Sequence, residues 1–448
     1  MSTSTPVRSP DLRNPSLMTR RGWWLVLLNI VLPGSAQVLA GDRKLGRFGL
    51  VSTFVLWAGI ALALLLFFLA RELFLTLSTN PVALWVLEVA LGFYAVLWVI
   101  LTIDTLRLVR LVRTAPRARG FLAGLAVIAL AVGAGTAAYG AVVVDSARSL
   151  LSNVFGGGQI AEPIDGRYNI LLLGGDAGPD RIGIRPDSIS VASIDASTGA
   201  VTMIGIPRNL QYAPFPEGSP MLGPFPDGYN CGVDCLISYL YTYGEEHPEL
   251  YPDAEAAGST PGVEAMRDAV EGTTGLTMQY YVLIEMQGFK NLIDALGGID
   301  IDVKERVGIG SNTNPDGSPA EAGGWIEPGK RHMDGETALW YARSRYQTTD
   351  YARMERQREV QEAILRQADP QTVLLKFQDI ARASADLATT DIPQAMLGRF
   401  TDLALKSKEQ PMERLQLVPP EFAPDAPDFE KIRAAVAEAV APAEEAAE

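Results

Sequence analysis

The sequence predicts a three-layer α/β/α domain with a central mixed sheet, preceded by an all-α membrane region. Long apolar runs are almost confined to residues 1–145, and the remaining residues have the composition of a soluble domain. In that second part, short apolar strands alternate with helical segments. This alternation is typical of a sheet that carries helices on both faces.

Charge is divided along the chain in the same way. Residues 1–120 hold 13 Lys+Arg and 5 Asp+Glu, whereas the rest holds 25 and 47, and the whole chain carries −14. A nucleic-acid-binding surface needs positive charge opposite the phosphates. The acidic soluble part therefore argues against nucleic acid as a partner, and solubility is sufficient to explain its negative charge.

Three apolar runs are each long enough to cross a bilayer: residues 48–70, 82–103 and 121–144. An earlier run, 23–40, is interrupted at Pro33-Gly34. Basic residues mark cytoplasmic segments, and they cluster both before residue 22 and in the loop 107–119. An even number of crossings must join two cytoplasmic segments. Run 23–40 is therefore expected not to span the membrane, and to be interfacial or re-entrant instead.

These observations predict a multi-pass cell-membrane protein whose last membrane helix leads to an extracytoplasmic soluble part. The predicted parts are a cytoplasmic N-terminus (1–22), a membrane region (23–145), a linker (146–166), an α/β domain (167–370), a C-terminal extension (371–433) and a tail (434–448). The tail is rich in Ala and Glu, and we expect a frayed helix or a disordered segment there.

The soluble part contains five segments with the apolar pattern of strands and four with the pattern of helices. The strands are predicted at 168–173, 188–194, 200–206, 280–284 and 299–303. The helices are predicted at 263–271, 289–296, 335–342 and 351–367. The first strand ends in two glycines, and a short apolar run closed by glycine suits a strand that is covered on both faces.

The two cysteines, Cys231 and Cys235, lie four residues apart. In an oxidising compartment they can form a disulfide that closes a small loop, and otherwise they remain free thiols. A zinc site is not expected, because it needs about four ligands and the chain has only two histidines. Histidine-based acid–base catalysis is not expected either.

Charged residues lie where loops leave the predicted strands, which is where open α/β sheets bind ligands. They are Asp176, Arg185, Asp187, Arg208, Arg343, Arg345, Asp350, Arg353 and Arg356, with Gln357 beside them. Guanidinium groups match phosphate oxygens bidentately, and aspartates suit Mg²⁺, so the set is compatible with a bound pyrophosphate. The alternative is an ordinary solvated helix face over residues 353–359, with surface ion pairs.

Seven segments occur in the order found in one known family. They are NILLLGGD (169–176), RPDSISVASID (185–195), TMIGIPRN (202–209), LISYLYTYG (236–244), GFKNLIDALGGIDIDV (288–303), MDGETALWYARSR (333–345) and DYARMERQ (350–357). The stretch from about residue 168 to 367 thereby resembles the LytR-CpsA-Psr domain. The sequence departs from the family at Asn209, where an aspartate is usual, and the cysteine pair is not part of the family pattern.

The resemblance implies a phosphotransferase that moves a glycopolymer from a polyprenyl-pyrophosphate carrier to a peptidoglycan hydroxyl, with Mg²⁺ and a hydrophobic pocket for the lipid. Carried over by position, Asp176 and Asp187 are the metal-proximal acids. The pyrophosphate-binding set is Arg185, Arg208, Arg343, Arg345, Arg353, Arg356 and Gln357. Arg208, Arg345 and Asp350 are the catalytic candidates, and either Asp350 or Asp187 is the candidate for polarising the acceptor hydroxyl.

Two other functions are compatible with the same residues. A non-catalytic binding or regulatory module for lipid-linked envelope precursors would need the same arginines. A polyprenyl pyrophosphatase would differ only in using water as the acceptor. Mg²⁺-dependent turnover distinguishes a transferase from the binding module, whereas only the identity of the acceptor distinguishes it from a pyrophosphatase.

Overall fold

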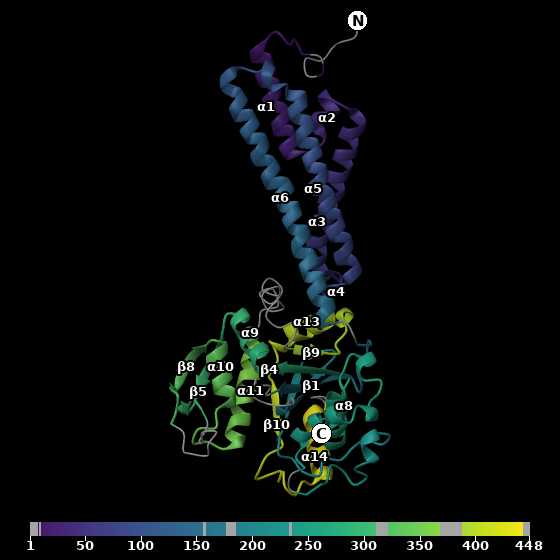
Figure 1. Ribbon diagram of the computed structural model, residues 1–448, viewed down its shortest axis with the longest axis vertical. Coiled ribbons are helices and arrows are strands. Elements are labelled where there is room, and N and C mark those ends of the chain that lie inside the picture. Colours follow the sequence, from purple (N-terminus) through teal and green to yellow (C-terminus); the bar gives the residue numbers. More distant parts are fainter. Residues whose placement is uncertain are drawn as a thin grey trace. The chain divides into compact units, whose positions relative to one another are not determined.

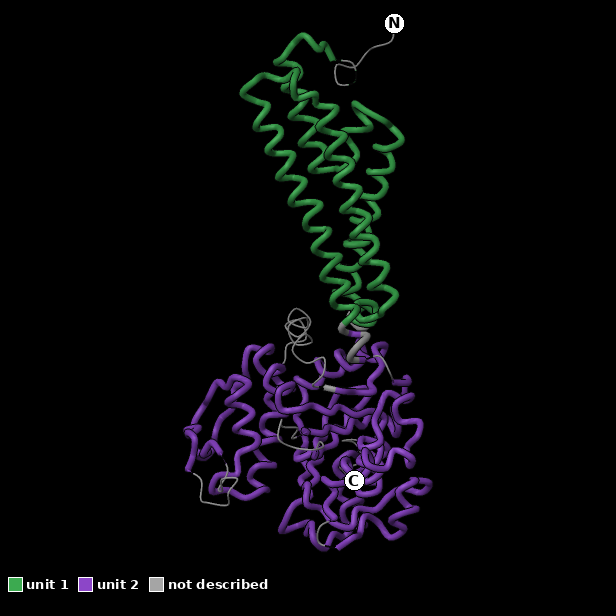
Figure 2. Tube along the Cα trace, in the orientation of Figure 1, with its two compact units in different colours: residues 1–149 green, residues 150–448 purple. Residues whose placement is uncertain are grey.

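The computed structural model describes residue 8 and residues 10–155, 158–175, 185–232, 235–310, 321–367 and 388–441. The chain divides into two compact units, Met1–Ser149 and Leu150–Glu448 (Figure 2). Each unit is described by itself. The predicted metal ligand Asp176 lies outside the described residues, as do residues 371–387 of the predicted C-terminal extension and residues 442–448 of the predicted tail.

The first unit is all-α, as predicted (Figure 1). Its helices are α1 (Pro15–Val31), α2 (Ser35–Ala40), α3 (Arg43–Leu69), α4 (Arg71–Thr79), α5 (Pro81–Val109) and α6 (Pro116–Val154), with a 3₁₀ turn at Leu111–Arg113. Three helical segments are long and apolar enough to cross a membrane: Arg43–Leu69, Pro81–Arg113 and Pro116–Ser149. They coincide with the three predicted runs, whereas the short helix α4 was not predicted.

The apolar run 23–40 is broken where proline and glycine occur. Helix α1 ends at Val31 and α2 begins at Ser35, with Gly34 between them in the left-handed conformation at φ 97°. A Cβ atom at Gly34 would lie 2.6 Å from the carbonyl oxygen of Gly46, so the turn requires glycine. The fully buried Gln37 side chain donates to the carbonyl oxygen of Leu101 on α5 at 2.8 Å. The run therefore forms two short helices packed against α5 rather than one long helix.

The second unit is built on a six-stranded mixed sheet in the order β10-β3-β2-β1-β4-β9. The strands are β1 (Arg167–Gly175), β2 (Pro186–Asp195), β3 (Val201–Ile206), β4 (Tyr280–Glu285), β9 (Ala388–Thr390) and β10 (Glu413–Gln416). Pairs β1–β4 and β3–β10 are parallel, and the other pairs are antiparallel. The predicted mixed sheet is confirmed, and its two short edge strands were not predicted.

One predicted strand lies outside this sheet. Strand β5 (Ile299–Val303) pairs with β8 (Gly329–Met333) in a separate two-stranded sheet. A second small ribbon joins β6 (Val307–Gly308) to β7 (Trp325–Ile326). The side chains of β5 alternate between buried and exposed, so this strand covers only the small core beneath α10 and α11.

The helices of the second unit lie on both faces of the main sheet, which gives the predicted three layers (Figure 1). One face packs against α7 (Leu240–Glu246), α8 (Pro261–Thr274) and α14 (Phe429–Val440). The other face carries α9 (Met286–Leu296), α10 (Gly335–Arg343), α11 (Asp350–Gln367) and α13 (Leu397–Ser407). Short 3₁₀ turns lie at Pro220–Leu222, Ile237–Tyr239, Pro248–Leu250, Glu255–Ala257 and Gln394–Met396.

The predicted tail is helical in its described portion. Helix α14 begins at Phe429, earlier than the predicted boundary at 434, because the side chain of Asp428 caps it by accepting from the backbone N–H of Lys431. Ile432 and Val436 are buried in the core under the sheet. This apolar stripe at helical spacing holds the segment in place, so it is not frayed as far as Val440.

Candidate active site

Four strand ends bring polar groups to one edge of the main sheet. Strands β1, β3 and β4 run parallel to one another, so their carboxyl ends share this edge, and the antiparallel β2 begins there. Asp187 is the second residue of β2, and Arg208 follows β3 by two residues. The sheet topology alone therefore places these two side chains next to each other.

The turn between α10 and α11 adds the remaining charged residues. Helix α10 ends at Arg343, and the buried Ser344 hydroxyl donates to the carbonyl oxygen of Gly308, which holds the turn. Arg345 follows in this turn, and its backbone N–H donates to Gly310 at 3.3 Å. Helix α11 then begins at Asp350, which places Arg353 one turn further along the same helix face.

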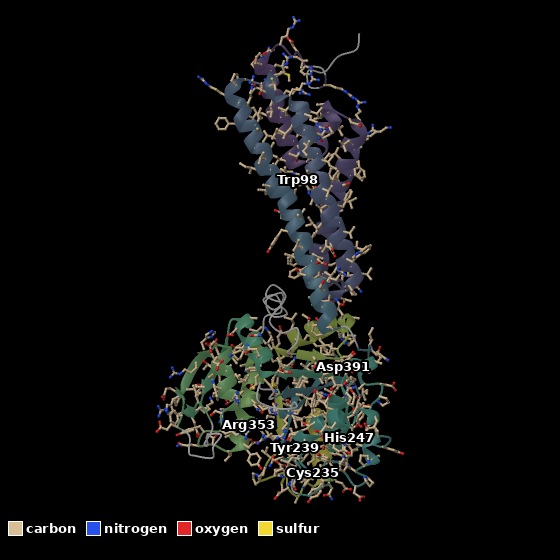
Figure 3. The ribbon with its side chains drawn as sticks, viewed as in Figure 1. Trp98, Cys235, Tyr239, His247, Arg353 and Asp391 are labelled. Carbon is tan, nitrogen blue, oxygen red and sulfur yellow. A yellow bond between two sulfur atoms is a disulfide. The ribbon has the colours of Figure 1, made fainter. Side chains whose placement is uncertain are left out.

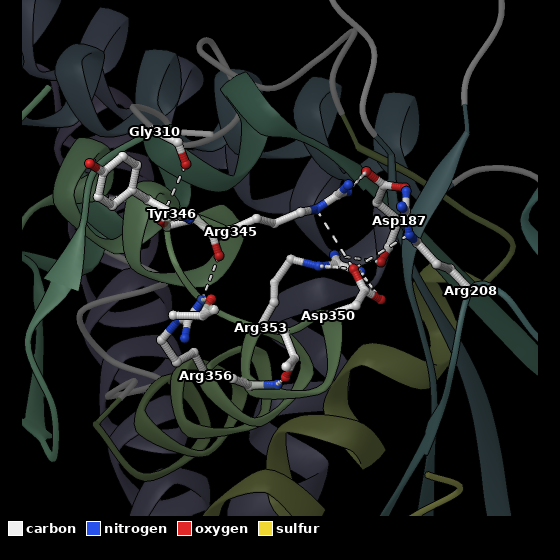
Figure 4. A network of polar contacts seen from close by, with 12 residues as sticks. Asp187, Arg208, Gly310, Arg345, Tyr346, Asp350, Arg353 and Arg356 are labelled. Carbon is white, nitrogen blue, oxygen red and sulfur yellow. Dashed lines mark hydrogen bonds and ion pairs between the residues drawn. The ribbon is translucent and has the colours of Figure 1, made fainter. Parts of the chain in front are cut away.

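These side chains converge on two carboxylates (Figure 4). Arg208 bonds one oxygen of Asp187 at 2.5 Å, and Arg345 bonds the other at 3.2 Å. Arg353 donates to both oxygens of Asp350, at 3.1 and 3.0 Å, and to the backbone oxygen of Asp187 at 2.8 Å. Arg208 and Arg345 also lie 3.6 and 3.7 Å from Asp350. We call these five residues the arginine–aspartate cluster.

The cluster holds three cations and only two anions, and it is partly shielded from water. The Arg353 side chain is 2% exposed, and those of Asp350 and Asp187 are 27% and 20% exposed. Burial raises the pKa of Asp350, but the hydrogen bonds from Arg353 and the charges of Arg353, Arg208 and Arg345 outweigh it and hold that pKa below its ordinary value. Burial and the nearby charges of Arg208 and Arg353 lower the pKa of Arg345. The surplus cation favours an additional anion at this position.

A cavity of about 1440 Å³ opens beside the cluster, between the sheet and helices α9, α10 and α11. Its polar end is lined by Arg185, Asp187, Arg208, Tyr239, Glu285, Arg343, Arg345, Arg353 and Gln357. Its apolar wall comes from the sheet (Leu172, Ala192, Ile194, Met203, Val282, Ile284) and from the helices (Phe289, Leu292, Leu339, Trp340, Val360, Ile364, Leu365). One ligand could therefore place an anionic group on the cluster and an apolar chain against the wall.

Most of the predicted site residues meet at this cavity. Arg185 lies over the ring of Tyr239 at 4.9 Å, and Arg343 lies over Trp340 at 4.8 Å, so each guanidinium is held by an aromatic face. Gln357 also lines the cavity, and its side-chain oxygen has no hydrogen-bond partner among the described residues.

Arg356 is placed differently from the other predicted arginines. Its guanidinium donates to the backbone oxygens of Tyr341 at 2.8 Å and Ser344 at 2.5 Å, and it does not line the cavity. It therefore stabilises the turn that carries Arg345. Arg353, Arg356 and Arg358 are all buried, so this stretch of α11 is not the solvated helix face that was the alternative to a binding site.

The cysteines form a disulfide, Cys231–Cys235, which decides between the two predicted states. The chain leaving Cys235 runs beside the segment that follows β3: the N–H of Ile237 donates to Leu210 at 2.9 Å, and that of Ser238 donates to Arg208 at 3.2 Å. Tyr239 follows directly and lines the cavity. Figure 3 labels both Cys235 and Tyr239. The disulfide thus closes a loop next to the segment that supports Arg208.

Of the residues given above for the polar end of the cavity, sequence reasoning missed two, Tyr239 and Glu285. Tyr239 lies within LISYLYTYG, but a tyrosine in an aromatic-rich helical stretch is usual for a core position. Glu285 is the last residue of β4 and directly precedes α9, and its side chain makes no capping hydrogen bond to that helix. Its position at the end of a strand was the available signal, and the same signal identified Asp187 and Arg208.

The described carboxylates can contribute to an Mg²⁺ site. Mg²⁺ is commonly held by one or two carboxylates together with substrate phosphates and water. Asp187 lies beside the cavity, and arginines are the bonding partners of its carboxylate among the described residues, which do not include its predicted partner Asp176. No group of three or more potential metal-ligating His, Cys, Asp or Glu side chains occurs in the described part of the chain. The donor set therefore suits a cation shared with a phosphate ligand.

The LytR_cpsA_psr family model matches residues 152–426, which is more than half of the chain and includes the whole arginine–aspartate cluster. The chain therefore belongs to the LytR-CpsA-Psr family. The resemblance seen in the seven sequence segments is confirmed.

Two curated relatives carry activity names. The polyisoprenyl-teichoic acid–peptidoglycan teichoic acid transferase TagU of Enterococcus faecalis is 28% identical over 229 residues, covering 50% of this chain and 61% of that protein. The corresponding TagV of Bacillus subtilis is 26% identical over 263 residues, covering 56% of this chain and 58% of that protein. The chain thus spans about three fifths of the length of these relatives.

Solved structures also align with part of this chain. The crystal structure of B. subtilis TagV aligns with a TM-score of 0.43 at 21% identity, covering 62% of this chain and 100% of that chain. TagT bound to LI-WTA aligns with a TM-score of 0.42 at 19% identity, covering 63% of this chain and 92% of that chain.

Proposed function

We propose that this protein is a membrane-anchored transferase that moves a glycopolymer from a polyprenyl-pyrophosphate carrier to a hydroxyl of peptidoglycan. The observation that carries the proposal is the arginine–aspartate cluster at the polar end of a large apolar cavity. Each end of the cavity matches one part of such a carrier. The names of the two curated relatives support the same class of reaction.

The polar end suits a pyrophosphate. Among the described residues, Arg208, Arg345 and Arg353 surround two carboxylates, so this part of the site carries one more positive than negative charge. Arg185 and Arg343 line the same cavity, and neither forms an ion pair with a carboxylate among the described residues. A pyrophosphate offers several anionic oxygens to these donors, and charge-assisted hydrogen bonds of this type are among the strongest in proteins.

The apolar end suits a long lipid. Cavities for drug-sized ligands measure about 300–1,000 Å³, and this one is larger, at about 1440 Å³. Its walls include apolar side chains from the sheet and the helices, such as Ile284, Phe289 and Leu365. Burial of polyprenyl methylene and methyl groups would contribute about 25 cal/mol per Å² of apolar surface removed from water.

In the proposed reaction, an acceptor hydroxyl attacks the phosphorus nearer the glycopolymer, and polyprenyl phosphate leaves. The arginines of the cluster neutralise the charge that develops on the phosphate oxygens, which is the main contribution a protein makes to phosphoryl transfer. Asp187 orients Arg208 and Arg345 through both of its carboxylate oxygens. Mg²⁺, held by Asp187 and Asp176, would supply further charge neutralisation.

The proposed location follows from the three long apolar helices. With the N-terminus and the loop 107–119 in the cytoplasm, three crossings place residues 145–448 on the extracytoplasmic side. The broken run 23–40 stays on the cytoplasmic side of this arrangement. A disulfide between Cys231 and Cys235 is compatible with an oxidising compartment.

The full-length protein in detergent, incubated with a C15 polyprenyl pyrophosphate that carries one N-acetylhexosamine and with soluble peptidoglycan fragments, tests the proposal. We expect Mg²⁺-dependent release of polyprenyl phosphate and a sugar phosphate on the fragments. Arg345→Ala should reduce the rate by about 10²–10³-fold, the usual cost of losing one such donor. The matched control is Arg366→Ala, an exposed arginine near the end of α11.

Three results would contradict the proposal. Binding of the lipid without release would favour a binding module. Release of polyprenyl phosphate at the same rate without peptidoglycan fragments, and with the sugar phosphate appearing free, would favour a pyrophosphatase. Equal rates in the wild type and Arg345→Ala would contradict the site.

A further inference from the structure

A third carboxylate lies at the same edge of the sheet as the arginine–aspartate cluster. Glu285 is the last residue of β4 and lines the cavity. In the sheet, Gly175 at the end of β1 pairs with Glu285 on one side and with Pro186 on the other. Glu285 and Asp187 are thus separated by one strand, or roughly 10 Å between the backbones of β4 and β2. Both residues also line the same cavity at this edge of the sheet.

Glu285 differs from the two carboxylates of the cluster in its surroundings. No hydrogen bond or ion pair engages its carboxylate among the described residues, and it does not cap the helix that follows it. Its neighbours are Tyr241, on the opposite face of the sheet, and Met286, whose sulfur accepts from Arg343 at 3.1 Å. The carboxylate is therefore available to a ligand in the cavity.

Asp187 and Asp350 are poor proton acceptors because arginines already occupy their oxygens. Asp187 bonds an arginine with each oxygen. Asp350 bonds Arg353 with both oxygens, and three guanidiniums hold its pKa below the ordinary value. Burial instead raises the pKa of Glu285, with no cation opposing it. A carboxylate with a raised pKa is the better general base.

We propose that Glu285 is the general base that accepts the proton from the acceptor hydroxyl, and this inference rests on the proposed transferase function. The hydroxyl oxygen forms a bond to the phosphorus nearer the glycopolymer, and its proton passes to the Glu285 carboxylate. The bond from that phosphorus to the bridging oxygen breaks, and polyprenyl phosphate leaves with the electron pair. The arginines on the Asp187 side stabilise the leaving group, while Glu285 acts from the β4 side.

The geometry suits an in-line displacement. Across the sheet edge the order is Arg208 after β3, Asp187 on β2, Gly175 on β1 and Glu285 on β4. A pyrophosphate held by the arginines would lie over β2 and β1. The acceptor would then approach from the β4 side, opposite the leaving group, with Glu285 beside its hydroxyl.

The test compares Glu285→Gln, Glu285→Ala and Glu285→Asp in the full-length protein, with the C15 polyprenyl-pyrophosphate sugar and peptidoglycan fragments described above. We expect Glu285→Gln to lower kcat by about 10²–10⁴-fold, the usual contribution of a general base. Its Kd for the lipid and its Mg²⁺ requirement should match the wild type. Formate should partly restore Glu285→Ala, because a small carboxylate can occupy the vacated space, and Glu285→Asp should keep part of the activity.

The control variant is Glu327→Gln, an exposed glutamate paired with Arg306 away from the cavity, which should keep wild-type turnover. Wild-type turnover in Glu285→Gln would overturn the inference while leaving the transferase intact. A changed Mg²⁺ requirement would overturn it by making Glu285 a metal ligand, and weakened lipid binding would make it a binding residue. If the wild type itself transfers nothing, the proposed function fails and the inference fails with it.

Discussion

Removal of the Asp350 carboxylate should destabilise the second unit and strengthen pyrophosphate binding at the same time. Asp350→Ala leaves Arg353, whose side chain is 2% exposed, without the two hydrogen bonds that now compensate its charge. Arg208 and Arg345 also lose a neighbouring anion. The variant therefore has three guanidiniums around the single carboxylate of Asp187.

The size of the expected loss of stability follows from the burial of the ion pair between Asp350 and Arg353. Removing one partner of a fully buried ion pair costs about 3–5 kcal/mol, and because the Asp350 side chain is 27% exposed we expect the lower end, about 3 kcal/mol. For a domain of this size, each kcal/mol shifts the midpoint of thermal unfolding by roughly 2–4 °C. Asp350→Ala should therefore unfold roughly 6–12 °C below the wild type.

An anionic ligand should recover part of this loss. A ligand that binds only the folded protein stabilises it by RT ln(1 + [L]/Kd). Inorganic pyrophosphate can take the place of the missing carboxylate beside Arg353, so it should raise the midpoint of Asp350→Ala by more than that of the wild type. The assay is thermal unfolding of the full-length protein in detergent over a series of pyrophosphate concentrations. The control is Asp302→Ala, which removes an exposed pair with Lys304 and should leave the midpoint unchanged.

The contribution of Asp350 to stability should depend on pH in a defined direction. The folded-state pKa of Asp350 is lower than its ordinary value of 3.8. Its contribution to stability is therefore present above that value and is lost as the pH falls through the lower folded-state pKa. The midpoint difference between the wild type and Asp350→Ala should shrink on acidification. Equal midpoints at neutral pH, or equal stabilisation by pyrophosphate, would refute the account of the cluster.

Three further predictions concern other parts of the second unit. Reduction of Cys231–Cys235, or its double replacement by serine, should lower the free energy of unfolding by about 2 kcal/mol, as measured by denaturant titration with and without reductant. Gly205→Ala would place a Cβ atom 2.8 Å from the buried Arg358 Nε and should cost about 1–3 kcal/mol in the same titration; an unchanged midpoint would contradict the packing. Burial raises the pKa of Asp195, but hydrogen bonds from Ser197 and Thr198 lower it to about 2. The wild type should therefore be more stable than Asp195→Ala above about pH 4, and this difference should disappear towards pH 2. Thermal unfolding of both proteins across that pH range measures it.

Local pattern was sufficient to predict the regular elements. The apolar run before Gly174-Gly175 forms β1, and the helix predicted at 351–367 is α11 with one residue added at its start. Strands β9 and β10 could not be predicted, because three or four residues at a sheet edge carry too little periodicity to stand out. The sequence at Ile299–Val303 predicted a strand correctly, but the choice of partner depends on contacts with β8 that the local pattern does not specify.

The residues of the candidate site were predicted less completely than the helices and strands. Residues at the start or just past the end of a strand, such as Asp187 and Arg208, could be identified because the topology of an open sheet gathers them at one edge. The spacing of Arg353 and Arg356 predicts a shared helix face, yet one lies in the cluster and the other bonds the backbone of a neighbouring turn. The spacing of two residues on a helix specifies the direction in which their side chains leave the helix axis. The partner that each guanidinium contacts depends on the chain segments that pack beside the helix.

The sequence by itself determined the division into a membrane region and an α/β domain, the three long apolar helices, the break at Pro33-Gly34 and the family. These features depend on local hydropathy, on backbone preferences and on motifs read in order along the chain. Only the tertiary structure decided that Cys231 and Cys235 are bonded, that Arg356 supports a turn, and that Tyr239 and Glu285 line the cavity. Those outcomes depend on contacts between residues far apart in the chain, and the charge, burial and hydrogen bonds of each side chain are set by the neighbours that folding brings to it.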